Sequence, residues 1–557
     1  MQEDIRGALA LALSSLGVEI EPSKASLEFT GDLAHGDLAS SVALQYAKEL
    51  RMAPRALAEK IVVSLNVGHP MPYISKIEVA GPGFINFYLA DSVFAQSLQD
   101  IIDNPDEWGK NALHKGEKIM VEYTDPNPFK EFHIGHLMSN AIGEAIARLM
   151  EYAGAEVRRA NYQGDVGPHV AKAIWGIKKI GADPHDSAAL GKAYATGGAA
   201  YESDEATKAE IDAINAKVYD KSDTRINEIY SAGRKASLAH FEEIYKILGT
   251  KFDYYFFESE TAPRGLKLVH EQEDVFEKSD GAIVYKGEQD GLHTRVFITQ
   301  KGLPTYETKD LGLAQMKAEK WNFDLSITIT AHEQADYFAV VLAAMRKILP
   351  DIAAKILHVS HGMMRLTEGK MSSRTGNVIT GESLLTDVAE AAKERAAESR
   401  ADNAEQLSKD IAVAAIKYQV LKQTSGKDIV FDRERALSLE GDSGPYMQYT
   451  YARATQIVAR AENEKITVAV DTNAAANDLV RLMYRFPAAV ERAVQELEPH
   501  LVTNFLIEFA GAFNRWYAQV RIVEGEDAAH KVAITEAARI TLKNGLYLLG
   551  IPAPEKM

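Results

Sequence analysis

The sequence of 557 residues contains no cysteine. Disulfide bonds and thiolate zinc sites are therefore excluded, and we expect a protein without zinc. Long apolar runs are also lacking, and none reaches the roughly 20 residues that a membrane-spanning helix needs. The apolar run at residues 8–16 is short and lacks the basic leader and cleavage pattern of a signal peptide. These absences predict a cytoplasmic protein with no membrane partner.

Positive charge is scarce, because 62 lysines and arginines face 79 aspartates and glutamates and give a net charge of −17. This balance argues against a protein that coats nucleic acid as histones do. Local basic patches can still bind RNA, because the electrostatic field at the binding surface matters more than the net charge. The chain is too long for one compact core, so about three domains are expected.

One stretch organises the rest of the chain. Residues 119–123 are mostly apolar and predict a strand, and the prolines at 126 and 128 predict a loop after it. From residue 134 to 150, apolar residues recur at steps of three and four, which predicts a helix with one apolar face. A helix that starts after a strand and a loop presents unpaired N–H groups and a positive dipole end to an anion, usually phosphate.

Three residues at this helix start suit a nucleotide. Gly135 has no side chain, so a base or ribose can lie against the backbone. His133 and His136 are three residues apart, and both can donate hydrogen bonds to phosphate oxygens. The alternative is that one histidine caps the strand and the other is a solvated surface residue. The strand, the loop and the long helix around the pair favour the phosphate site.

A second motif stands further along the chain, where residues 370–374 read Lys-Met-Ser-Ser-Arg after an apolar run at 356–359. The His-Ile-Gly-His motif at 133–136, followed by this one, resembles the two ATP-binding motifs of class I aminoacyl-tRNA synthetases. The resemblance implies catalytic roles for the two histidines and Lys370. It also implies an ATP site made of His133, Gly135, His136, Lys370, Met371 and Ser372.

The second motif departs from the family pattern at one place. Ser373-Arg374 stands where the family has its second lysine. In this family a lysine just before the first motif often takes over that role. Lys130 occupies this place, so the resemblance implies a catalytic role for Lys130.

Five further residues resemble the arginine-binding set of arginyl-tRNA synthetases. Tyr306 and Asp310 form a Tyr-x-Thr-x-Asp pattern and share a face at the start of a predicted helix. Gln334 follows the strand predicted at 326–329, and Glu122 and Asn127 stand at the family's offsets from the first motif. Without the resemblance, Tyr306 is as readily a packing residue and Asp310 a helix-end charge.

The chemistry of these residues agrees with arginine as the substrate. A guanidinium group is a planar cation with five donors, and carboxylates that accept in pairs hold it best. Glu122 and Asp310 supply two carboxylates, while Tyr306 and Gln334 can take the remaining donors. Asn127 can hold the α-amino or carboxylate end. Charge alone does not exclude lysine as the substrate.

Residues 1–112 predict a small α+β unit, with helices at 5–16, 41–51 and 54–65 and a strand pair at 74–79 and 84–89. This block resembles the N-terminal domain of arginyl-tRNA synthetases, which touches the tRNA elbow and reads a D-loop base. Phe84 and Asn86 lie two apart on one strand, so a ring and an amide stand side by side for a flipped-out base. The alternative is that Phe84 packs under the strand pair and Asn86 faces solvent.

Residues 385–557 are almost entirely helical in pattern. The stretch 444–454 resembles the start of the family's anticodon-binding domain and contains Tyr451 and Arg453. Aromatic rings beside arginine are surfaces on which single-stranded bases stack, so both are candidates for tRNA contact. A single aromatic residue at helical spacing is more often part of the core, and this alternative stays open.

The sequence therefore predicts a multidomain α/β protein. We expect a Rossmann-like parallel-sheet catalytic domain at 113–384 with a helical insertion at about 172–257, an N-terminal α+β tRNA-binding domain at 1–112 and an all-α helical bundle at 385–557. The resemblance implies a monomeric arginine–tRNA ligase that forms arginyl-adenylate from L-arginine and ATP, with Mg²⁺ bound through ATP, and charges tRNA(Arg). A relative acting on another amino acid and a non-catalytic RNA-binding relative remain as alternatives.

Overall fold

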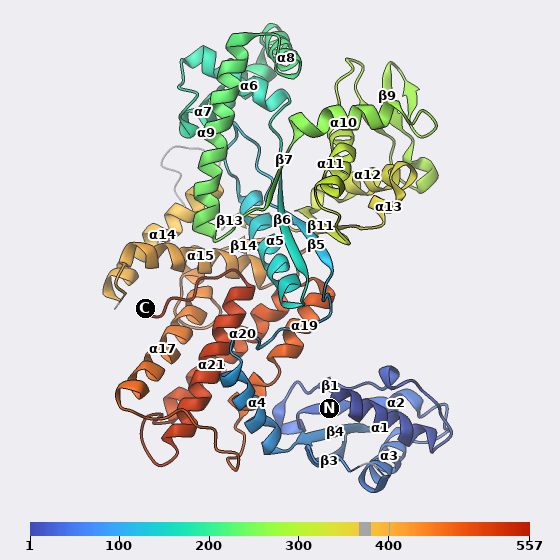
Figure 1. The fold of residues 1–557 in the computed structure, drawn as a ribbon, viewed down its shortest axis with the longest axis vertical. Coiled ribbons are helices and arrows are strands. Elements are labelled where there is room, and N and C mark those ends of the chain that lie inside the picture. The colour runs from blue at the N-terminus through green and yellow to red at the C-terminus, as the bar shows by residue number, and fades with distance from the viewer. Residues whose placement is uncertain (69, 367–379, 400) are drawn as a thin grey trace. The chain divides into compact units, whose positions relative to one another are not determined.

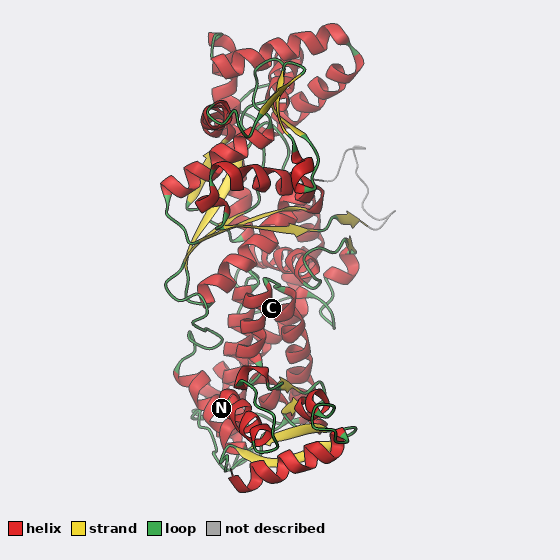
Figure 2. Ribbon diagram, turned by 90° about the vertical axis from the view of Figure 1, so that its right-hand side faces the viewer, coloured by secondary structure: helices red, strands yellow, loops and turns green. Residues whose placement is uncertain are grey.

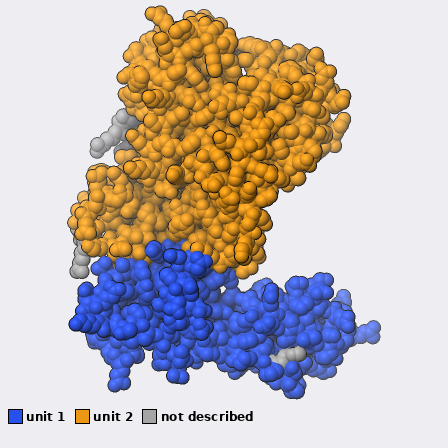
Figure 3. All heavy atoms as spheres, in the orientation of Figure 1, with its two compact units in different colours: residues 1–109, 453–489, 508–544 blue, residues 110–452, 490–507, 545–557 orange. Residues whose placement is uncertain are grey.

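The computed structural model describes residues 1–68, 70–366, 380–399 and 401–557. These residues form two compact units (Figure 3). Unit 1 comprises residues 1–109, 453–489 and 508–544, and unit 2 comprises residues 110–452, 490–507 and 545–557. Most of the described chain is helical (Figure 2). No helix within these described ranges is both long and apolar enough to cross a membrane.

Unit 2 is built on a parallel sheet of five strands in the order β12-β11-β5-β6-β7 (Figure 1). The strands are β5 (Lys118–Glu122), β6 (Glu156–Gln163), β7 (Tyr254–Phe257), β11 (Leu325–Ala331) and β12 (Ile356–His361). Helix α5 (Ile134–Tyr152) joins β5 to β6, and it carries the apolar face that its sequence predicts. The Rossmann-like parallel sheet is confirmed. In such sheets, ligands bind beyond the carboxyl ends of the strands, which is where β5 leads into His133.

The helical insertion consists of α6 (Pro168–Ile180), α7 (Ser187–Ser203), α8 (Glu205–Asp220) and α9 (Thr224–Leu248). Its helices pack closely because small residues lie at the contact. A Cβ on Gly176 would come within 2.0 Å of the carbonyl oxygen of Ala193, and one on Gly197 within 2.0 Å of that of Lys172. Strand β7 lies at the end of the range predicted for the insertion, yet it pairs with β6 and so belongs to the sheet.

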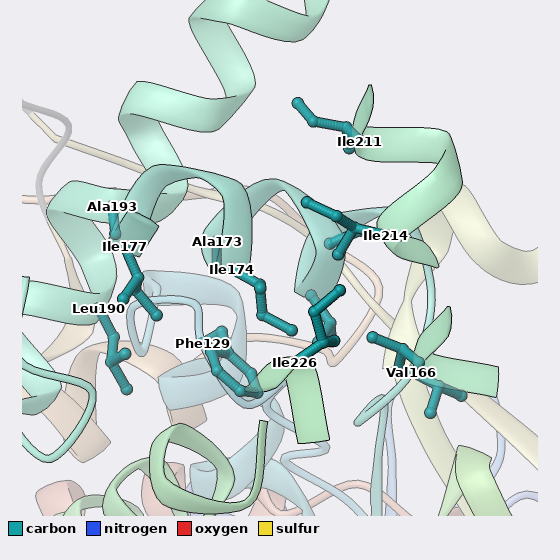
Figure 4. Close-up of a cluster of buried hydrophobic side chains, with 13 residues drawn as sticks. Phe129, Val166, Ala173, Ile174, Ile177, Leu190, Ala193, Ile211, Ile214 and Ile226 are labelled. Carbon is teal, nitrogen blue, oxygen red and sulfur yellow. The ribbon is translucent and has the colours of Figure 1, made fainter. Parts of the chain in front are cut away.

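The insertion has its own apolar core, shown in Figure 4. Residues that line it include Val170, Ile174, Ile177, Leu190, Ile211, Ile214 and Ile226. Phe129 comes from the loop between β5 and α5, and its ring enters this core. A Cβ on Gly233 of α9 would lie 2.3 Å from that ring, so glycine makes room for it. The loop that carries the predicted site residues is therefore anchored in the insertion.

A second, antiparallel sheet lies in the later half of the catalytic region, in the order β10-β9-β8. Its strands are β8 (Glu277–Ser279), β9 (Ala282–Tyr285) and β10 (Arg295–Ile298). The predicted strands at 282–285 and 295–299 are thus present, and they pair with each other outside the parallel sheet. The helices here are α10 (Glu258–His270), α11 (Tyr306–Lys320), α12 (Ala335–Ile348) and α13 (Pro350–Ala353). Strand β13 (Met364–Leu366) pairs in parallel with β14 (Ile429–Phe431).

The N-terminal part of unit 1 is an antiparallel sheet in the order β1-β2-β4-β3 with helices around it. The strands are β1 (Glu28–Phe29), β2 (Leu38–Ser40), β3 (Ile74–Ala80) and β4 (Phe84–Leu89). The helices are α1 (Gln2–Ser14), α2 (Val42–Tyr46), α3 (Pro54–Gly68) and α4 (Asp91–Asp103). The predicted α+β block and its strand pair are confirmed, while α2 is shorter than the predicted helix at 41–51.

The described chain after residue 380 is almost entirely helical, as predicted for 385–557, apart from the short strand β14. It contains α14 (Gly381–Glu398), α15 (Ala404–Leu421), α16 (Arg433–Ala436), α17 (Gly444–Asn463), α18 (Asp478–Met483), α19 (Phe486–Glu496), α20 (His500–Gln519) and α21 (Ala528–Leu548). Within unit 1, the side chain of Arg481 on α18 forms an ion pair of 2.9 Å with Asp37. This largely buried pair holds α18 to the N-terminal part of unit 1.

Candidate active site

Helix α5 begins directly after His133, which is its N-cap residue. The backbone N–H of His133 donates a hydrogen bond to Nδ1 of His136 at 3.1 Å, and the two rings stack with their centroids 3.4 Å apart. A Cβ on Gly135 would lie 3.0 Å from two atoms of the His133 ring. The glycine thus leaves space for the stacked pair as well as for a ligand at the helix end.

Both histidines are held neutral in this structure. Burial and, to a smaller extent, the charge of the nearby Lys130 together lower the pKa of His133 to about 4. Burial also lowers the pKa of His136 well below its usual value. Because Nδ1 of His136 accepts a hydrogen bond, the ring hydrogen is assigned to Nε2. His136 can therefore donate one hydrogen bond to an anion but brings no positive charge.

Lys130 supplies a cation near the start of this helix. Its Nζ lies 5.4 Å from the centroid of the Tyr194 ring. Burial lowers the pKa of Lys130, and the charge of Lys172 lowers it further, whereas the Glu258 carboxylate raises it. The Lys130 charge in turn depresses the pKa of both histidines, which shows that the three side chains lie within electrostatic reach. The predicted partners Lys370, Met371 and Ser372, and the variant positions Ser373 and Arg374, lie outside the described residues.

The loop between β5 and α5 is held in a strained conformation. Thr124, Asp125 and Phe129 have φ values of 80°, 47° and 69°, in the left-handed region that non-glycine residues rarely adopt. Hydrogen bonds hold each of them: Ser139 accepts from the Thr124 backbone at 3.0 Å, Asp125 accepts from Tyr162 at 2.7 Å, and Ser237 accepts from Phe129 at 3.0 Å. Such strain is typical of a loop that presents functional side chains.

Buried carboxylates gather beyond the carboxyl ends of β5 and β7. Oε2 of Glu122 lies 3.0 Å from Nζ of Lys317 on α11, and both side chains are buried. Glu258, the first residue of α10, accepts a 2.6 Å hydrogen bond from Nζ of Lys309. Each of these two carboxylates is therefore paired with a buried lysine. Of these two carboxylates, only Glu122 was predicted from the sequence.

Asp310 differs from the other two carboxylates. It accepts a hydrogen bond from the Tyr337 hydroxyl on α12, and among the described residues no lysine, arginine or histidine forms an ion pair with it. The pKa of Asp310 is raised to about 8: burial and the charges of Glu122 and Glu258 raise it, and the Tyr337 hydrogen bond partly offsets them. Among the described residues, Asp310 is thus a half-buried acid without a paired cation, next to carboxylates of the same sign.

Asn127 lies beside this acidic cluster. A Cβ on Gly164, in the loop after β6, would be 2.2 Å from Oδ1 of Asn127 and 3.2 Å from Oε1 of Glu258. The amide of Asn127 and the carboxylate of Glu258 therefore meet at the backbone of Gly164. The structure thus brings Glu122, Asn127 and Asp310 into one region, as the sequence predicts.

Tyr306 and Gln334 lie at the rim of this region. Tyr306 is the first residue of α11, its side chain is 57% exposed, and its ring centroid lies 5.0 Å from Nζ of Lys309. The alternative that Tyr306 is a packing residue is therefore wrong. Gln334 is exposed in the short 3₁₀ turn His332–Gln334, at the carboxyl end of β11. It stands three residues before Tyr337, the partner of Asp310.

Four residues of the cluster were missed by sequence reasoning: Glu258, Lys309, Lys317 and Tyr337. The signal for Glu258 was present, since a carboxylate follows the aromatic strand β7 at a helix start. Lys317 lies on the same helix as Asp310, seven residues later. Tyr337 carries no local signal, because its role depends on the contact between α11 and α12.

Three family models match consecutive parts of the chain. The model for the catalytic domain of class I (R) tRNA synthetases matches residues 97–433, the Arginyl tRNA synthetase N terminal domain matches 2–89, and the DALR anticodon binding domain matches 447–557. The chain belongs to the class I arginyl-tRNA synthetase family. The recognised family is thereby confirmed.

Relatives of this synthetase chain match over its whole length. It is 30% identical to an arginine–tRNA ligase of Limosilactobacillus reuteri, with all of both chains covered. It is 30% identical to that of Clostridium acetobutylicum, over 92% of both chains. The solved arginyl-tRNA synthetase of Thermus thermophilus shares the fold, with a TM-score of 0.80 and 24% identity over all of both chains. That of Plasmodium falciparum has a TM-score of 0.77 and 20% identity over 100% of this chain and 99% of its own.

The N-terminal domain of the synthetase chain has a pocket of about 470 Å³, lined in part by His35, Phe84 and Asn86. The side chain of Phe84 is 40% exposed and that of Asn86 is 5% exposed. Phe84 therefore does not pack under the strand pair, and Asn86 does not simply face solvent. The alternative, in which Phe84 packs under the strands and Asn86 faces solvent, is therefore wrong. The ring of Phe84 and the amide of Asn86 line the same pocket.

The two predicted contact residues on α17 have different environments. The Tyr451 side chain is 2% exposed, so no ring face is available to a base. The prediction of a direct tRNA contact for Tyr451 is corrected on this ground, and its aromatic ring is core, as helical spacing often indicates. The guanidinium of Arg453 donates to Asn514 and lies 4.8 Å from the Tyr517 ring, which is 40% exposed.

Proposed function

We propose that the protein is an arginine–tRNA ligase. It activates L-arginine with ATP to arginyl-adenylate, releases pyrophosphate, and transfers arginine to the 3′-terminal adenosine of tRNA(Arg). The observation that carries the proposal is Asp310, a half-buried acid with no paired cation among the described residues, in a cluster of carboxylates near the start of α5. A cationic amino acid fits this cluster and a nucleotide fits the helix start.

The arginine subsite is centred on Asp310. Glu122 and Glu258 already pair with lysines, so Asp310 is the carboxylate that gains most from a guanidinium. The planar fork of arginine can contact Asp310 and neighbouring oxygens at once, whereas the ammonium of lysine is a point charge. Asn127 holds the α-amino or carboxylate end. Tyr306 and Gln334 take the remaining donors at the rim.

The ATP subsite is the N-terminus of α5. Nε2 of His136 donates to the triphosphate, His133 lies on the same side, and Gly135 lets the nucleotide approach the backbone. Lys130 adds a positive charge, and Lys370 with Met371 and Ser372 completes the set. ATP would carry its own Mg²⁺, which would offset phosphate charge, and we expect no zinc because the sequence has no cysteine.

The reaction needs no protein nucleophile. The arginine carboxylate attacks the α-phosphate in line, so the protein acts by placing the two substrates and by stabilising charge on the phosphorus and on pyrophosphate. A neutral His136 that donates one hydrogen bond suits this role, because it needs no proton transfer. The strained loop fixes Asn127 relative to the histidines.

The tRNA is held by regions outside the catalytic domain. The pocket with Phe84 and Asn86 takes a base of the D-loop, and Arg453 with Tyr517 offers a cation and a ring to single-stranded bases. We place the enzyme in the cytoplasm as a monomer, since tRNA charging serves translation there. Gel filtration with light scattering checks the monomer.

Charging of a purified tRNA pool with labelled arginine tests the function. The expected result is charging that depends on ATP, on tRNA and on arginine, with lysine and each other amino acid tested in parallel. Charging with lysine in place of arginine would point to the relative with another specificity. Binding of tRNA without charging would support the non-catalytic relative.

A further inference from the structure

Asp165 lies in the loop after β6, and its side chain is 0% exposed. Three residues donate to it. The backbone N–H of Ser259 donates to Oδ1 at 2.8 Å, and the Ser259 hydroxyl donates to Oδ2 at 2.8 Å. On helix α9, Nε of Arg234 and the hydroxyl of Tyr230 donate to Oδ2 at 2.9 and 3.1 Å. A buried carboxylate with this many donors has a fixed position.

The contact with Ser259 fixes the start of α10. The N-cap residue of this helix is Phe257, and its side chain makes no capping hydrogen bond. The first N–H groups of a helix have no partner within the helix. Asp165, in another loop, accepts a hydrogen bond from the Ser259 N–H and so acts as a cap for α10. Glu258, the first residue of α10, is held between this cap and Lys309.

The contact with α9 ties the same point to the insertion. Tyr230 and Arg234 are four residues apart and share a face of α9. The guanidinium of Arg234 also lies 4.0 Å from the ring centroid of Phe257, the residue before Glu258. One arginine of the insertion therefore contacts both Asp165 and the junction of β7 and α10.

We propose that Asp165 is a positioning residue that ties Arg234 of the insertion to Glu258 of the arginine subsite. This inference rests on the proposed function. Gly164, the neighbour of Asp165, stands between Asn127 and Glu258, so a shift of Asp165 displaces both sides of the subsite. In the described part of the chain, the four hydrogen bonds to the Asp165 carboxylate come from Ser259, Arg234 and Tyr230 and none from His133 or His136. Loosening the tie therefore affects arginine binding more than ATP binding.

Arg234→Met in the full chain tests the link between Arg234 and Asp165. The change removes the cation that pairs with Asp165 and keeps roughly the length of the side chain. Lys235→Met is the matched control, since Lys235 is an exposed neighbour on the same helix. Charging of a tRNA pool is measured with arginine and ATP varied in turn. The KM for arginine should rise about tenfold in Arg234→Met, with the KM for ATP within about twofold of the wild-type value. Lys235→Met should leave both unchanged.

Asp165→Asn provides the second variant for a double-mutant comparison, and thermal unfolding reports whether this variant folds. In an Asp165→Asn background, Arg234→Met should raise the arginine KM by no more than about twofold further, because both changes act through one carboxylate. Where Asp165→Asn does not fold, Tyr230→Phe combined with Arg234→Met gives the same comparison. An arginine KM that stays at the wild-type value in Arg234→Met overturns the inference, and so does an equal rise in Lys235→Met or in the ATP KM.

The two proposals fail in different ways. A wild-type chain that does not charge tRNA with arginine refutes the proposed function. A wild-type chain that does so, with Arg234→Met and Asp165→Asn leaving the arginine KM unchanged, refutes only the positioning role of Asp165.

Discussion

The hydroxyl of Tyr337 on α12 donates a hydrogen bond to the carboxylate of Asp310 on α11. This contact distinguishes Asp310 from its neighbours, because Lys317 pairs with Glu122 and Lys309 pairs with Glu258. A hydroxyl supports a carboxylate without cancelling its charge. Asp310 therefore keeps the capacity to bind a cation, and its own ionisation becomes part of binding.

Arginine affinity should depend on the protonation of Asp310. Burial raises the pKa of this carboxyl to about 8, so below that pH it is mostly neutral and offers no charge to a guanidinium. The dissociation constant for arginine should fall about tenfold per pH unit as the pH rises toward 8, and then level off. Binding should release a proton at pH 7. Calorimetry in two buffers of different ionisation enthalpy, with tRNA present, measures both effects.

Asp310→Asn is the control for this pH dependence. It keeps the shape of the side chain but cannot ionise, and it should weaken arginine by about 1.5–3 kcal/mol or more. Burial also raises the pKa of Asp125 and of Glu258, so their titration would persist in the variant. An unchanged pH profile in Asp310→Asn would assign the proton to one of those groups instead.

Tyr337→Phe should move the same profile to higher pH. Without the hydroxyl, the ionised form of Asp310 loses a hydrogen bond that lowers its pKa. At pH 7.5 the arginine KM should rise about tenfold, which corresponds to about 1.5 kcal/mol for a hydrogen bond to a charged group. The KM for ATP is the internal control. A shift of the profile to lower pH would contradict this account.

The elements with strong local signals were predictable from the sequence. The period of apolar residues from 134 to 150 gave α5, and Pro126 and Pro128 gave the loop before it. Together they placed His133, Gly135 and His136 at the helix start. Glu122, Asn127 and Asp310 also meet as expected, but their placement depended on resemblance to a family.

The remaining parts of the site depend on contacts between distant segments. Strand β7 is only four residues long and follows four helices, so the sequence prediction assigned its aromatic residues to the insertion. Glu258, which follows β7, was therefore not predicted as a site residue. The cap that Asp165 gives to α10 joins residues 94 apart in the chain, and no periodicity reports such a contact. Burial of Tyr451, which is 2% exposed, likewise could not be told from helical spacing alone.

His136→Ala should slow the chemical step. The change removes a donor aimed at charge that develops on phosphate, which is worth roughly 3 kcal/mol or about a hundredfold in turnover. The arginine KM should change little. Because Nδ1 of His136 also accepts from the His133 backbone, thermal unfolding is measured alongside. Unchanged turnover with a raised arginine KM would place His136 in the amino-acid subsite.

Lys130→Ala should cost about as much turnover as Lys370→Ala, if Lys130 replaces the lysine missing at Ser373. Ser373→Lys should then partly restore the activity of Lys130→Ala. Because both positive charges would act on one phosphate group, the two changes should be non-additive. Strict additivity in the four-way comparison of turnover would refute the shared role.

Phe84→Ala should weaken tRNA binding without weakening the fold. The Phe84 ring is 40% exposed at the rim of the N-terminal pocket, so its loss leaves no cavity in the core. Stacking of one base is worth roughly 1–3 kcal/mol, so the KM for tRNA should rise about tenfold while that for ATP stays the same. Asn86→Ala should raise the tRNA KM as well, through lost hydrogen bonds to the base edge.

Val63→Ala is the matched control, because Val63 is an exposed apolar residue of the same domain, 62% exposed on α3. If Phe84→Ala and Asn86→Ala together leave the tRNA KM at the value of the Val63→Ala control, the pocket does not read a base.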